Sequence, residues 1–330
     1  MKVSVIVLNW NGRDMLAGCL GSLALQTFRD FEVILADNGS TDGSAEYVRE
    51  RFPWVRLLAL ETNIGFSGGN NRALSLCKGE LIVTLNNDTV AEPDFLTELS
   101  AAADRDPGVG MVAALLLNFF TPGILDAAGI APGHDGLGYC LGHGEPVSVP
   151  GGEPTEIFGP SAGAALYRRS MLEEVGFFDN DFFAYYEDLD LAWRGRHSGW
   201  RCVTAPHAVV RHMHSATSGK TTPFTIYHLH RNKWYVLLKN WPMRLLLRHL
   251  PRILFTDLAS FSLAAMKGCG GAAFRARLAV LAALPRLLAE RRKLCAHNRF
   301  FQPERYFVQR KVISLLKRKL GLPGMPELKR

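Results

Sequence analysis

The 330-residue sequence lacks several features that would assign it to common classes of protein. Its six cysteines are scattered without C-x-x-C spacing, so we expect neither a zinc site nor a disulfide framework, but free thiols in a reducing cytosol. No run of about 18 uncharged apolar residues occurs, so a membrane-spanning helix is not expected. The first residues, MKVSVIVLNWNG, predict a β-strand and not a signal peptide, because the apolar run is short and lacks a cleavage site.

Two glycine motifs that bind nucleotide phosphates are also missing. A dinucleotide-binding Rossmann domain has G-x-G-x-x-G in its first strand-to-helix turn, but that turn holds one glycine here, Gly12. The glycines of residues 65–69 follow the third predicted strand and lack the spacing. No G-x-x-x-x-G-K-[ST] P-loop is present. Any phosphate-binding site must therefore be built in another way.

Acidic residues are scarce in the last third of the chain. Residues 221–330 carry 22 Lys and Arg against 4 Asp and Glu, a net charge of +18, whereas residues 1–220 carry 16 against 27, a net of −11. We therefore expect two parts with different roles, 1–220 and a basic region 221–330 that faces something anionic. The remaining composition, 48% hydrophobic and 21% charged, is that of a globular protein that buries a large core.

Strand-like and helix-like patterns alternate along the first part of the chain. Strands are predicted at 2–8, 31–36, 55–60, 81–85, 110–117 and 200–204. Helices are predicted at 13–25, 44–51, 70–77, 92–103, 170–175 and 187–197, with a glycine-rich loop at 64–69 and a loop-rich excursion at 119–156. This alternation predicts an α/β fold with a mostly parallel sheet covered by helices.

Each of the first four predicted strands ends in polar residues: Asn9 and Asn11, then Asp37 and Asn38, then Asn63, then Asn86, Asn87 and Asp88. A single cluster of this kind is typical of a turn. Four at one edge indicate a ligand site, because open α/β sheets bind ligands beyond the carboxyl ends of their strands. Asp88 is a hard oxygen ligand suited to Mg²⁺ or Mn²⁺.

Three carboxylates, Glu187, Asp188 and Asp190, open a predicted helix after an aromatic run at 182–186. The helix dipole favours acidic residues at this position, which could account for all three. Alternatively, one of them is a general base held between aromatic rings and close to a substrate hydroxyl.

Three histidines, His207, His212 and His214, fall within eight residues further on. A single histidine there could be structural, but the neighbouring hydroxyls, with Thr217 and Ser218 among them, would suit phosphate oxygens.

Six motifs in order resemble the inverting family 2 glycosyltransferases with the GT-A fold, and within them the rhamnosyltransferase-like branch. They are VSVIVLNWNG (3–12), ILADNGSTDGS (34–44), TNIGFSGGNNRAL (62–74), LNNDTV (85–90), GPSAGAALYRRSMLEEVGFFDNDFFAYYEDLDLAWR (159–194) and VVRHMHSATSG (209–219). The resemblance covers about residues 2–220 and continues more loosely through Arg231 and Asn232. It implies a Rossmann-like GT-A catalytic domain at 1–220 with a basic α-helical C-terminal region at 221–330.

The resemblance also implies roles for individual residues. Donor-binding positions are Asn9, Asn11, Asp37, Asn38, Asn63, Gly65, Asn70, Arg72, Asn86, Asn87, Thr217 and Ser218. Asp88 and His212 would hold the divalent cation, Mg²⁺ or Mn²⁺, although the first aspartate of the family's D-x-D motif is Asn86 here. Asp188 would be the catalytic base, with Glu187 as the alternative.

The implied activity is transfer of a single sugar from a nucleotide-diphosphate sugar to a lipid-linked or cell-surface glycan precursor at the cytoplasmic face of a bacterial membrane. The branch favours dTDP-L-rhamnose, with UDP- and GDP-sugars as alternatives. A processive synthase would show Q-x-x-R-W and spanning helices, which are missing. A non-catalytic nucleotide-sugar sensor would lack Asp88 or Asp188, and a nucleotidyltransferase would have a Gly-rich basic loop after the first strand.

Two interpretations of the basic region remain open. Its helices could pack their apolar faces on the catalytic domain, with Arg and Lys solvated. Alternatively, they lie on an anionic membrane surface as a peripheral anchor. Nucleic acid is not an expected partner, because no recognisable readout module accompanies the charge.

Overall fold

The computed structural model describes residues 1–147, 152–213, 221–294 and 301–308. Its main sheet contains β1 (Val3–Asn9), β2 (Phe31–Asp37), β3 (Arg56–Ala59), β4 (Leu81–Asn86), β5 (Thr89–Ala91), β6 (Val109–Asn118), β7 (Leu125–Ala127), β10 (Glu156–Ile157), β11 (Ala164–Arg168) and β12 (Arg201–His212). A separate two-stranded sheet pairs β8 (Ile130–Pro132) with β9 (Gly138–Cys140).

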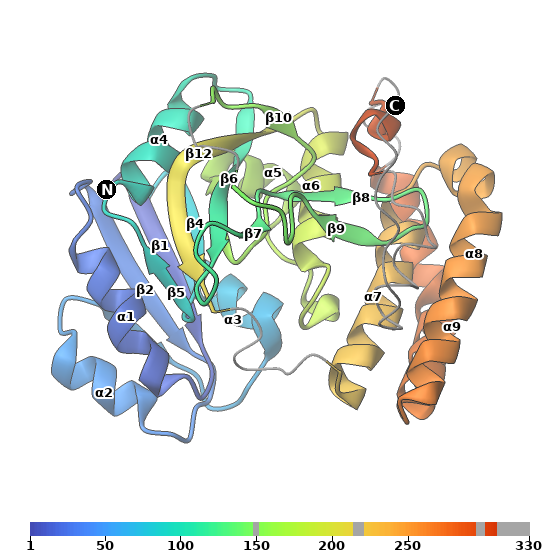
Figure 1. Cartoon of the computed structure of the whole chain (residues 1–330), viewed down its shortest axis with the longest axis horizontal. Coiled ribbons are helices and arrows are strands. Elements are labelled where there is room, and N and C mark those ends of the chain that lie inside the picture. Colours follow the sequence, from blue (N-terminus) through green and yellow to red (C-terminus); the bar gives the residue numbers. More distant parts are fainter. Residues whose placement is uncertain (148–151, 214–220, 295–300, 309–330) are drawn as a thin grey trace.

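The strands of the main sheet follow the order β10-β12-β6-β11-β4-β1-β2-β3, and β5 and β7 pair with β12 and β6 (Figure 1). β1 is parallel to β2 and β4, and β2 is parallel to β3. β11 runs antiparallel between β4 and β6, and β12 is parallel to β6. The carboxyl ends of β1, β2, β3, β4, β6 and β12 therefore meet at one edge, which confirms the predicted mostly parallel sheet.

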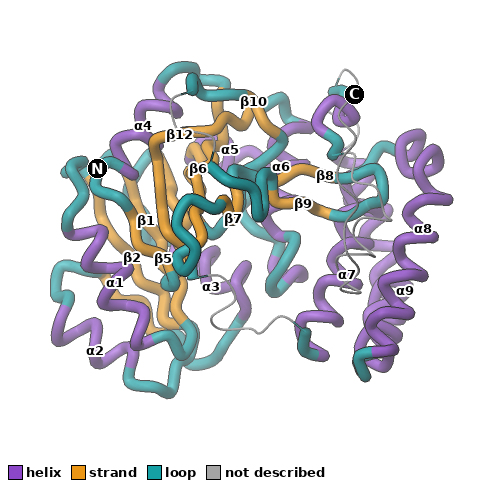
Figure 2. Tube along the Cα trace, in the orientation of Figure 1, coloured by secondary structure: helices purple, strands orange, loops and turns teal. Residues whose placement is uncertain are grey.

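Helices cover both faces of this sheet (Figure 2). They are α1 (Arg13–Ala24), α2 (Ser44–Arg51), α3 (Gly65–Leu74), α4 (Phe95–Asp104), α5 (Arg169–Val175) and α6 (Glu187–His197), with short 3₁₀ helices η1 (Asn180–Phe182) and η2 (Pro303–Tyr306). Val3, Val5 and Val7 of β1 pack with α1 and α4 on one face, whereas Ile6 packs with α3 and α5 on the other. This alternation follows from the two-residue period of a strand.

Several predicted elements differ from the structure. The glycine-rich segment 65–69 is already helical, because α3 begins at Gly65. Glycine allows α3 to lie close to β1: a Cβ on Gly69 would be 2.3 Å from Leu8 Cδ1. The strand predicted at 200–204 continues to His212 across a bulge, and the excursion at 119–156 contains the three short strands β7, β8 and β9 and ends at the start of β10.

The described part of the basic region contains three long helices: α7 (Pro223–Asn240), α8 (Met243–Met266) and α9 (Gly270–Leu294). Thr222 caps α7 by accepting a hydrogen bond from Thr225 N, and Pro223 occupies its first turn. Val236 and Leu237 belong to the same hydrophobic cluster as α5 and α6, so α7 packs on the catalytic core. Figure 1 shows α8 and α9 at the edge of the molecule, away from the main sheet.

In the ranges that the structure describes, no helix combines the length and the hydropathy needed to cross a membrane. The five cysteines in these ranges are free thiols, and Cys295 lies outside them.

Candidate active site

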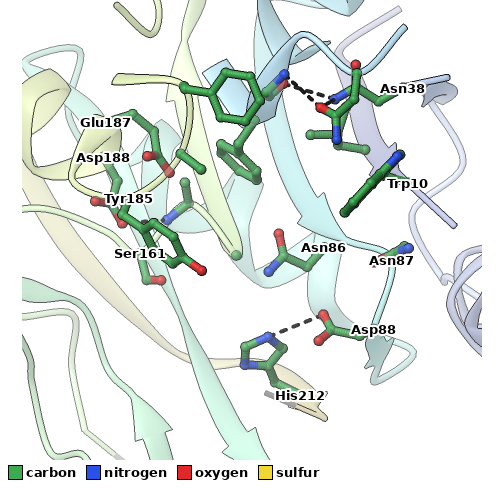
Figure 3. Close-up of a pocket in the computed structure, with 18 of the residues that line it drawn as sticks. Trp10, Asn38, Asn86, Asn87, Asp88, Ser161, Tyr185, Glu187, Asp188 and His212 are labelled. Carbon is green, nitrogen blue, oxygen red and sulfur yellow. Dashed lines mark hydrogen bonds and ion pairs between the residues drawn. The ribbon is translucent and has the colours of Figure 1, made fainter. Parts of the chain in front are cut away.

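A cavity of about 350 Å³ opens at the carboxyl ends of β1, β2 and β4 (Figure 3). Nine of the predicted site residues line it: Asn38, Asn63, Gly65, Asn86, Asn87, Asp88, Glu187, Asp188 and His212. They come from strand ends, from the start of α3, from the first turn of α6 and from the end of β12. The fold therefore brings together segments that are more than 150 residues apart in the sequence.

The strand ends beneath the cavity are joined by a buried network of side chains. Asn9 is fully buried; its Nδ2 donates to Asp37 Oδ1 (2.8 Å), and its Oδ1 accepts from Asn87 Nδ2 (2.7 Å). Ser40 N donates to Asp37 Oδ2 (3.2 Å). These bonds tie β1, β2 and β4 together, so Asn9 and Asp37 support the residues that face the cavity.

A second network orders the side of the cavity formed by Asn38, Asn63 and Gly65. Asn38 Nδ2 donates to Asn63 Oδ1 (2.9 Å) and to the Gly65 carbonyl (3.1 Å), while Asn38 Oδ1 accepts from Ile64 N (3.0 Å). Because Asn38 uses both ends of its amide within the protein, it holds the loop before α3 in place. The polar groups of this loop remain at the cavity wall.

A row of three side chains lies on the side of the cavity opposite Asn38: Asp88, His212 and, behind His212, Asp126. His212 Nε2 lies 3.3 Å from Asp88 Oδ1, and His212 Nδ1 lies 2.5 Å from Asp126 Oδ2. Burial alone would lower the pKa of His212, but the hydrogen bond with Asp126 and the negative charges of Asp88 and Asp126 outweigh it and raise that pKa to about 9. A carboxylate on one imidazole nitrogen and a second carboxylate facing the other is an arrangement common at metal-binding histidines.

The chemistry of this row fits a divalent cation. Asp88 is 5% exposed, and its Oδ1 accepts no hydrogen bond from the described residues. Across those same residues, no group of three or more His, Cys, Asp or Glu side chains is placed to hold a metal. Asp88 and His212 would supply two ligands, and a bound diphosphate would have to supply others, as Mg²⁺ and Mn²⁺ sites often allow.

The two candidate bases lie across the cavity in the first turn of α6. Asp188 accepts hydrogen bonds from Leu189 N (2.7 Å, Oδ1) and Ala162 N (3.3 Å, Oδ2). Burial raises its pKa from 3.8 to about 6, even though these donors lower it. Burial also raises the pKa of Glu187, and the charge of Asp188 raises it further. Asp188 accepts two backbone hydrogen bonds, whereas Glu187 Oε2 accepts none from the described residues, so the ionised form is better stabilised at Asp188.

Five predicted donor-binding residues lie outside the cavity lining, Asn9 and Asp37 among them. The Asn11 side chain accepts from Thr41 N (2.8 Å), and Asn70 Nδ2 donates to the Phe66 carbonyl (2.9 Å) within α3. Arg72 is exposed in the last turn of α3. The Asn11 and Asn70 side chains support local structure, and direct contacts of these residues with a donor stay predictions. Thr217 and Ser218 lie outside the described residues.

Several cavity residues were not identified from the sequence. Trp10 is 41% exposed and lines the cavity beside Asn38, and Ser161 lies beside Asp188. Phe224 reaches the cavity from α7. The sequence does offer an indication for Trp10, because a bulky aromatic residue stands there in a turn at the end of a strand. For Asp126, which contacts His212, the sequence offers no such indication, because it is 86 residues from His212 in a segment predicted as loop.

Residues 4–176, more than half of the chain, match the family described as Glycosyl transferase family 2. N-acetylglucosaminyl-diphospho-decaprenol L-rhamnosyltransferase of Mycobacterium tuberculosis is 29% identical over 271 residues, covering 71% of this chain and 83% of that protein. O-antigen biosynthesis protein RfbC of Myxococcus xanthus is 32% identical over 240 residues, covering 69% of this chain and 18% of that protein.

Solved structures share the fold. Staphylococcus aureus TarS 1-349 in complex with UDP-GlcNAc superposes with a TM-score of 0.57 at 20% identity, covering 98% of this chain and 93% of that chain. The family match, the similarity to a rhamnosyltransferase and the shared GT-A fold confirm the resemblance drawn from the six motifs. The chain is therefore a glycosyltransferase that belongs to glycosyltransferase family 2, and within that family it is rhamnosyltransferase-like.

Proposed function

We propose that the chain is an inverting, metal-dependent transferase that moves one sugar from a nucleotide-diphosphate donor to a hydroxyl of a lipid-linked glycan precursor. One observation carries the proposal: a buried carboxylate–histidine pair and a base with a raised pKa face the same cavity from different sides (Figure 3). The first suits a diphosphate leaving group, and the second suits an attacking hydroxyl.

The cation would be held by Asp88 and His212, and it would neutralise charge that develops on the departing diphosphate. The residues around it have separate tasks. The buried network of Asn9, Asp37 and Asn87 keeps the strand ends in place, and Asp126 fixes the orientation of the His212 ring. The protein thus supplies a site that is already ordered before the donor binds.

Asp188 would remove the proton from the acceptor hydroxyl as its oxygen attacks the anomeric carbon. The new bond forms from the acceptor oxygen to that carbon, while the bond from the carbon to the diphosphate oxygen breaks on the opposite face. A single displacement with one base inverts the anomeric configuration. A second acid is unnecessary because nucleoside diphosphate is already a good leaving group, in contrast to the paired carboxylates of glycosidases.

The similarity to a protein named for rhamnosyl transfer to N-acetylglucosaminyl-diphospho-decaprenol supports L-rhamnose as the transferred sugar and a prenyl-diphosphate-linked sugar as acceptor, and we propose dTDP-L-rhamnose as the donor. A panel of dTDP-, UDP- and GDP-sugars, incubated with such an acceptor and Mg²⁺ or Mn²⁺, tests this choice through release of nucleoside diphosphate. We expect release from dTDP-L-rhamnose. Release from a UDP- or GDP-sugar alone would contradict the donor assignment, and turnover of no donor would contradict the function.

Trp10 gives a test of the donor side. Its ring lines the cavity beside Asn38, at the edge where a nucleoside would lie (Figure 3). Stacking of a base on an aromatic ring contributes roughly 1–3 kcal/mol, so Trp10→Ala should raise the donor KM about tenfold and leave kcat nearly unchanged. Trp54→Ala is the control, because Trp54 is 45% exposed but does not line the cavity. Equal donor KM values for Trp10→Ala and wild type would contradict this placement.

We further propose that residues 1–220 form the catalytic domain and that 221–330 attach it to the inner face of the plasma membrane. Large apolar side chains are exposed along one stripe of α8, at Met243, Leu247, Leu254, Phe255, Leu258 and Met266. A second stripe on the neighbouring helix α9 consists of Phe274, Leu278 and Leu281. Exposed basic residues such as Arg244, Arg248 and Arg275 flank them. Apolar stripes bordered by positive charge suit an anionic lipid surface.

Co-sedimentation with phospholipid vesicles tests this surface. Wild type should bind vesicles that contain anionic lipid more tightly than neutral vesicles. The triple change Leu254→Ser, Phe255→Ser and Leu258→Ser should weaken binding at least about tenfold, because each side chain would bury apolar area in the interface. Leu25→Ser, which alters a 71% exposed residue after α1, is the control. Wild type that fails to bind anionic vesicles would contradict the proposal.

A further inference from the structure

The aromatic turn, residues 182–186, forms one wall of the cavity and has an unusual backbone. Phe183, Tyr185 and Tyr186 have φ values of 63°, 70° and 71°, in the left-handed region that is costly for aromatic residues. Three residues of the turn line the cavity, and both candidate bases follow directly as the first two residues of α6. A strained turn persists only where its surroundings hold it.

Asn232 of α7 provides that hold. It is fully buried, and its Nδ2 donates to the carbonyls of Phe182 (2.9 Å), Ala184 (2.8 Å) and Tyr185 (2.7 Å). Ser67 N of α3 donates to the remaining central carbonyl, that of Phe183 (3.1 Å). Carbonyls in an irregular turn have few partners in helices or strands, so a side-chain amide aimed at three of them determines the path of the turn.

Arg231 completes the contact from the same helix. Its Nε donates to Asn232 Oδ1 (2.8 Å), which fixes the orientation of that amide. Its Nη2 donates to the carbonyls of Asp181 (2.7 Å) and Phe182 (2.9 Å). The turn is therefore held by α3 on one side and by two consecutive residues of α7 on the other.

We propose that Asn232 is a positioning residue for catalysis: by holding the carbonyls of the aromatic turn, it aims the first turn of α6, and with it Asp188, into the cavity. This inference rests on the proposed function, because Asn232 acts only through the base. It also means that α7, in the basic region, completes the active site of the catalytic domain.

Two substitutions test this role. Asn232→Ala removes the amide, and Asn232→Asp keeps its size while replacing the donor by an acceptor. Each should lower kcat roughly 10²-fold, the loss expected when a reacting group is displaced by about 1 Å. The donor KM and nucleoside diphosphate binding should stay at the wild-type values. Arg231→Gln, at a half-buried position, should fold and should show a smaller fall in kcat, roughly tenfold.

A double-mutant cycle shows whether Asn232 works through the base. In an Asp188→Asn background, Asn232→Ala should cause no further loss of kcat, because the group that it positions is already gone. If the falls in kcat caused by Asn232→Ala and Asp188→Asn multiply in the double variant, the proposal is overturned. If Asp188→Asn alone keeps the wild-type rate, the proposed function fails, irrespective of what the Asn232 variants do.

Asp257→Asn controls for simple loss of stability. Asp257 of α8 accepts from Lys233 Nζ (2.5 Å) and Trp234 Nε1 (2.9 Å) of α7 and from Arg277 Nη2 (2.5 Å) of α9, so these bonds join the three C-terminal helices to one another. Asp257→Asn should lower Tm but leave kcat unchanged at a temperature where the protein is folded. Wild-type kcat in the Asn232 and Arg231 variants, or an equal fall in Asp257→Asn, would overturn the positioning role.

Discussion

Asp188→Asn is expected to lower kcat for sugar transfer by about 10³-fold while donor binding persists. Asp188 lines the cavity and carries the pKa that burial raises to about 6, so it is ionised yet basic near neutral pH. Removal of a positioned general base typically costs 10² to 10⁴ in rate. Steady-state release of nucleoside diphosphate in the presence of acceptor measures the effect.

Glu187→Gln is the matched comparison for this prediction. Glu187 is the adjacent carboxylate, 7% exposed, and its pKa is raised by burial and by the charge of Asp188. A protonated neighbour cannot accept the proton, so Glu187→Gln should retain most of the activity. An inactive Glu187→Gln variant beside an active Asp188→Asn variant would exchange the two roles.

Asp188→Asn should also stabilise the fold. A carboxyl group whose pKa is higher in the folded state than in the unfolded state opposes folding when it is ionised, so its penalty grows as the pH rises from 3.8 to about 6 and is complete above that. Asp188→Asn should therefore raise the free energy of unfolding at pH 7 by up to about 3 kcal/mol. Below pH 3.8 the difference should vanish.

Asp190 provides a control of opposite sign on the same helix. Burial would raise its pKa, but Lys239 and Arg194, with a hydrogen bond from Asn240, lower it. Its ionised form therefore favours folding, and Asp190→Asn should lower Tm at pH 7. Thermal unfolding of both variants at pH 4 and pH 7 tests the pair of predictions. Destabilisation by Asp188→Asn would contradict the account of the base.

In wild type, the acid limb of kcat/KM should be half-maximal near pH 6.

Asp88→Asn, or removal of divalent cations by EDTA, should lower the rate by about 10²- to 10³-fold. Without a cation, the charge that develops on the diphosphate loses its main electrostatic partner. Calorimetry should also show that Mn²⁺ tightens binding of nucleoside diphosphate to wild type but not to Asp88→Asn. Re-addition of Mn²⁺ should restore the activity of EDTA-treated wild type but not that of Asp88→Asn.

Glu92→Gln is the control for Asp88→Asn. Glu92 is a 41% exposed side chain just after β5 and pairs with Arg211, so the substitution removes a nearby carboxylate without touching the cavity. Its rate and metal dependence should equal those of wild type. Full activity of Asp88→Asn in the presence of EDTA would contradict the metal site and leave a cation-independent transferase.

Local sequence patterns predicted the sheet and much of the cavity, because strand ends and acidic helix starts are properties of short segments. Asn38, Asn63 and Asp88 follow three different strands, and a parallel sheet necessarily gathers them at one edge. The helical glycines of α3 were mistaken for a loop. Low helix propensity there is overridden by close packing on β1, where a Cβ at position 69 would meet Leu8.

Pairings between distant segments could not be read from these patterns. Asp126 meets His212 across 86 residues, and Asn232 meets the aromatic turn across about 50. Asp126 lies in a predicted loop and does not stand out in its segment, whereas Asn232 belongs to the looser part of the family resemblance, which implies no role for it. Three-dimensional contact alone identifies them as the residues that orient a metal ligand and a base.

The anomeric configuration of the transferred sugar tests the central claim most directly. Single displacement at this cavity, with Asp188 as the only base, predicts that NMR of the purified product shows the configuration opposite to that of the donor. Retention of configuration would contradict a single displacement and would require a covalent or otherwise double-displacement route at the same site.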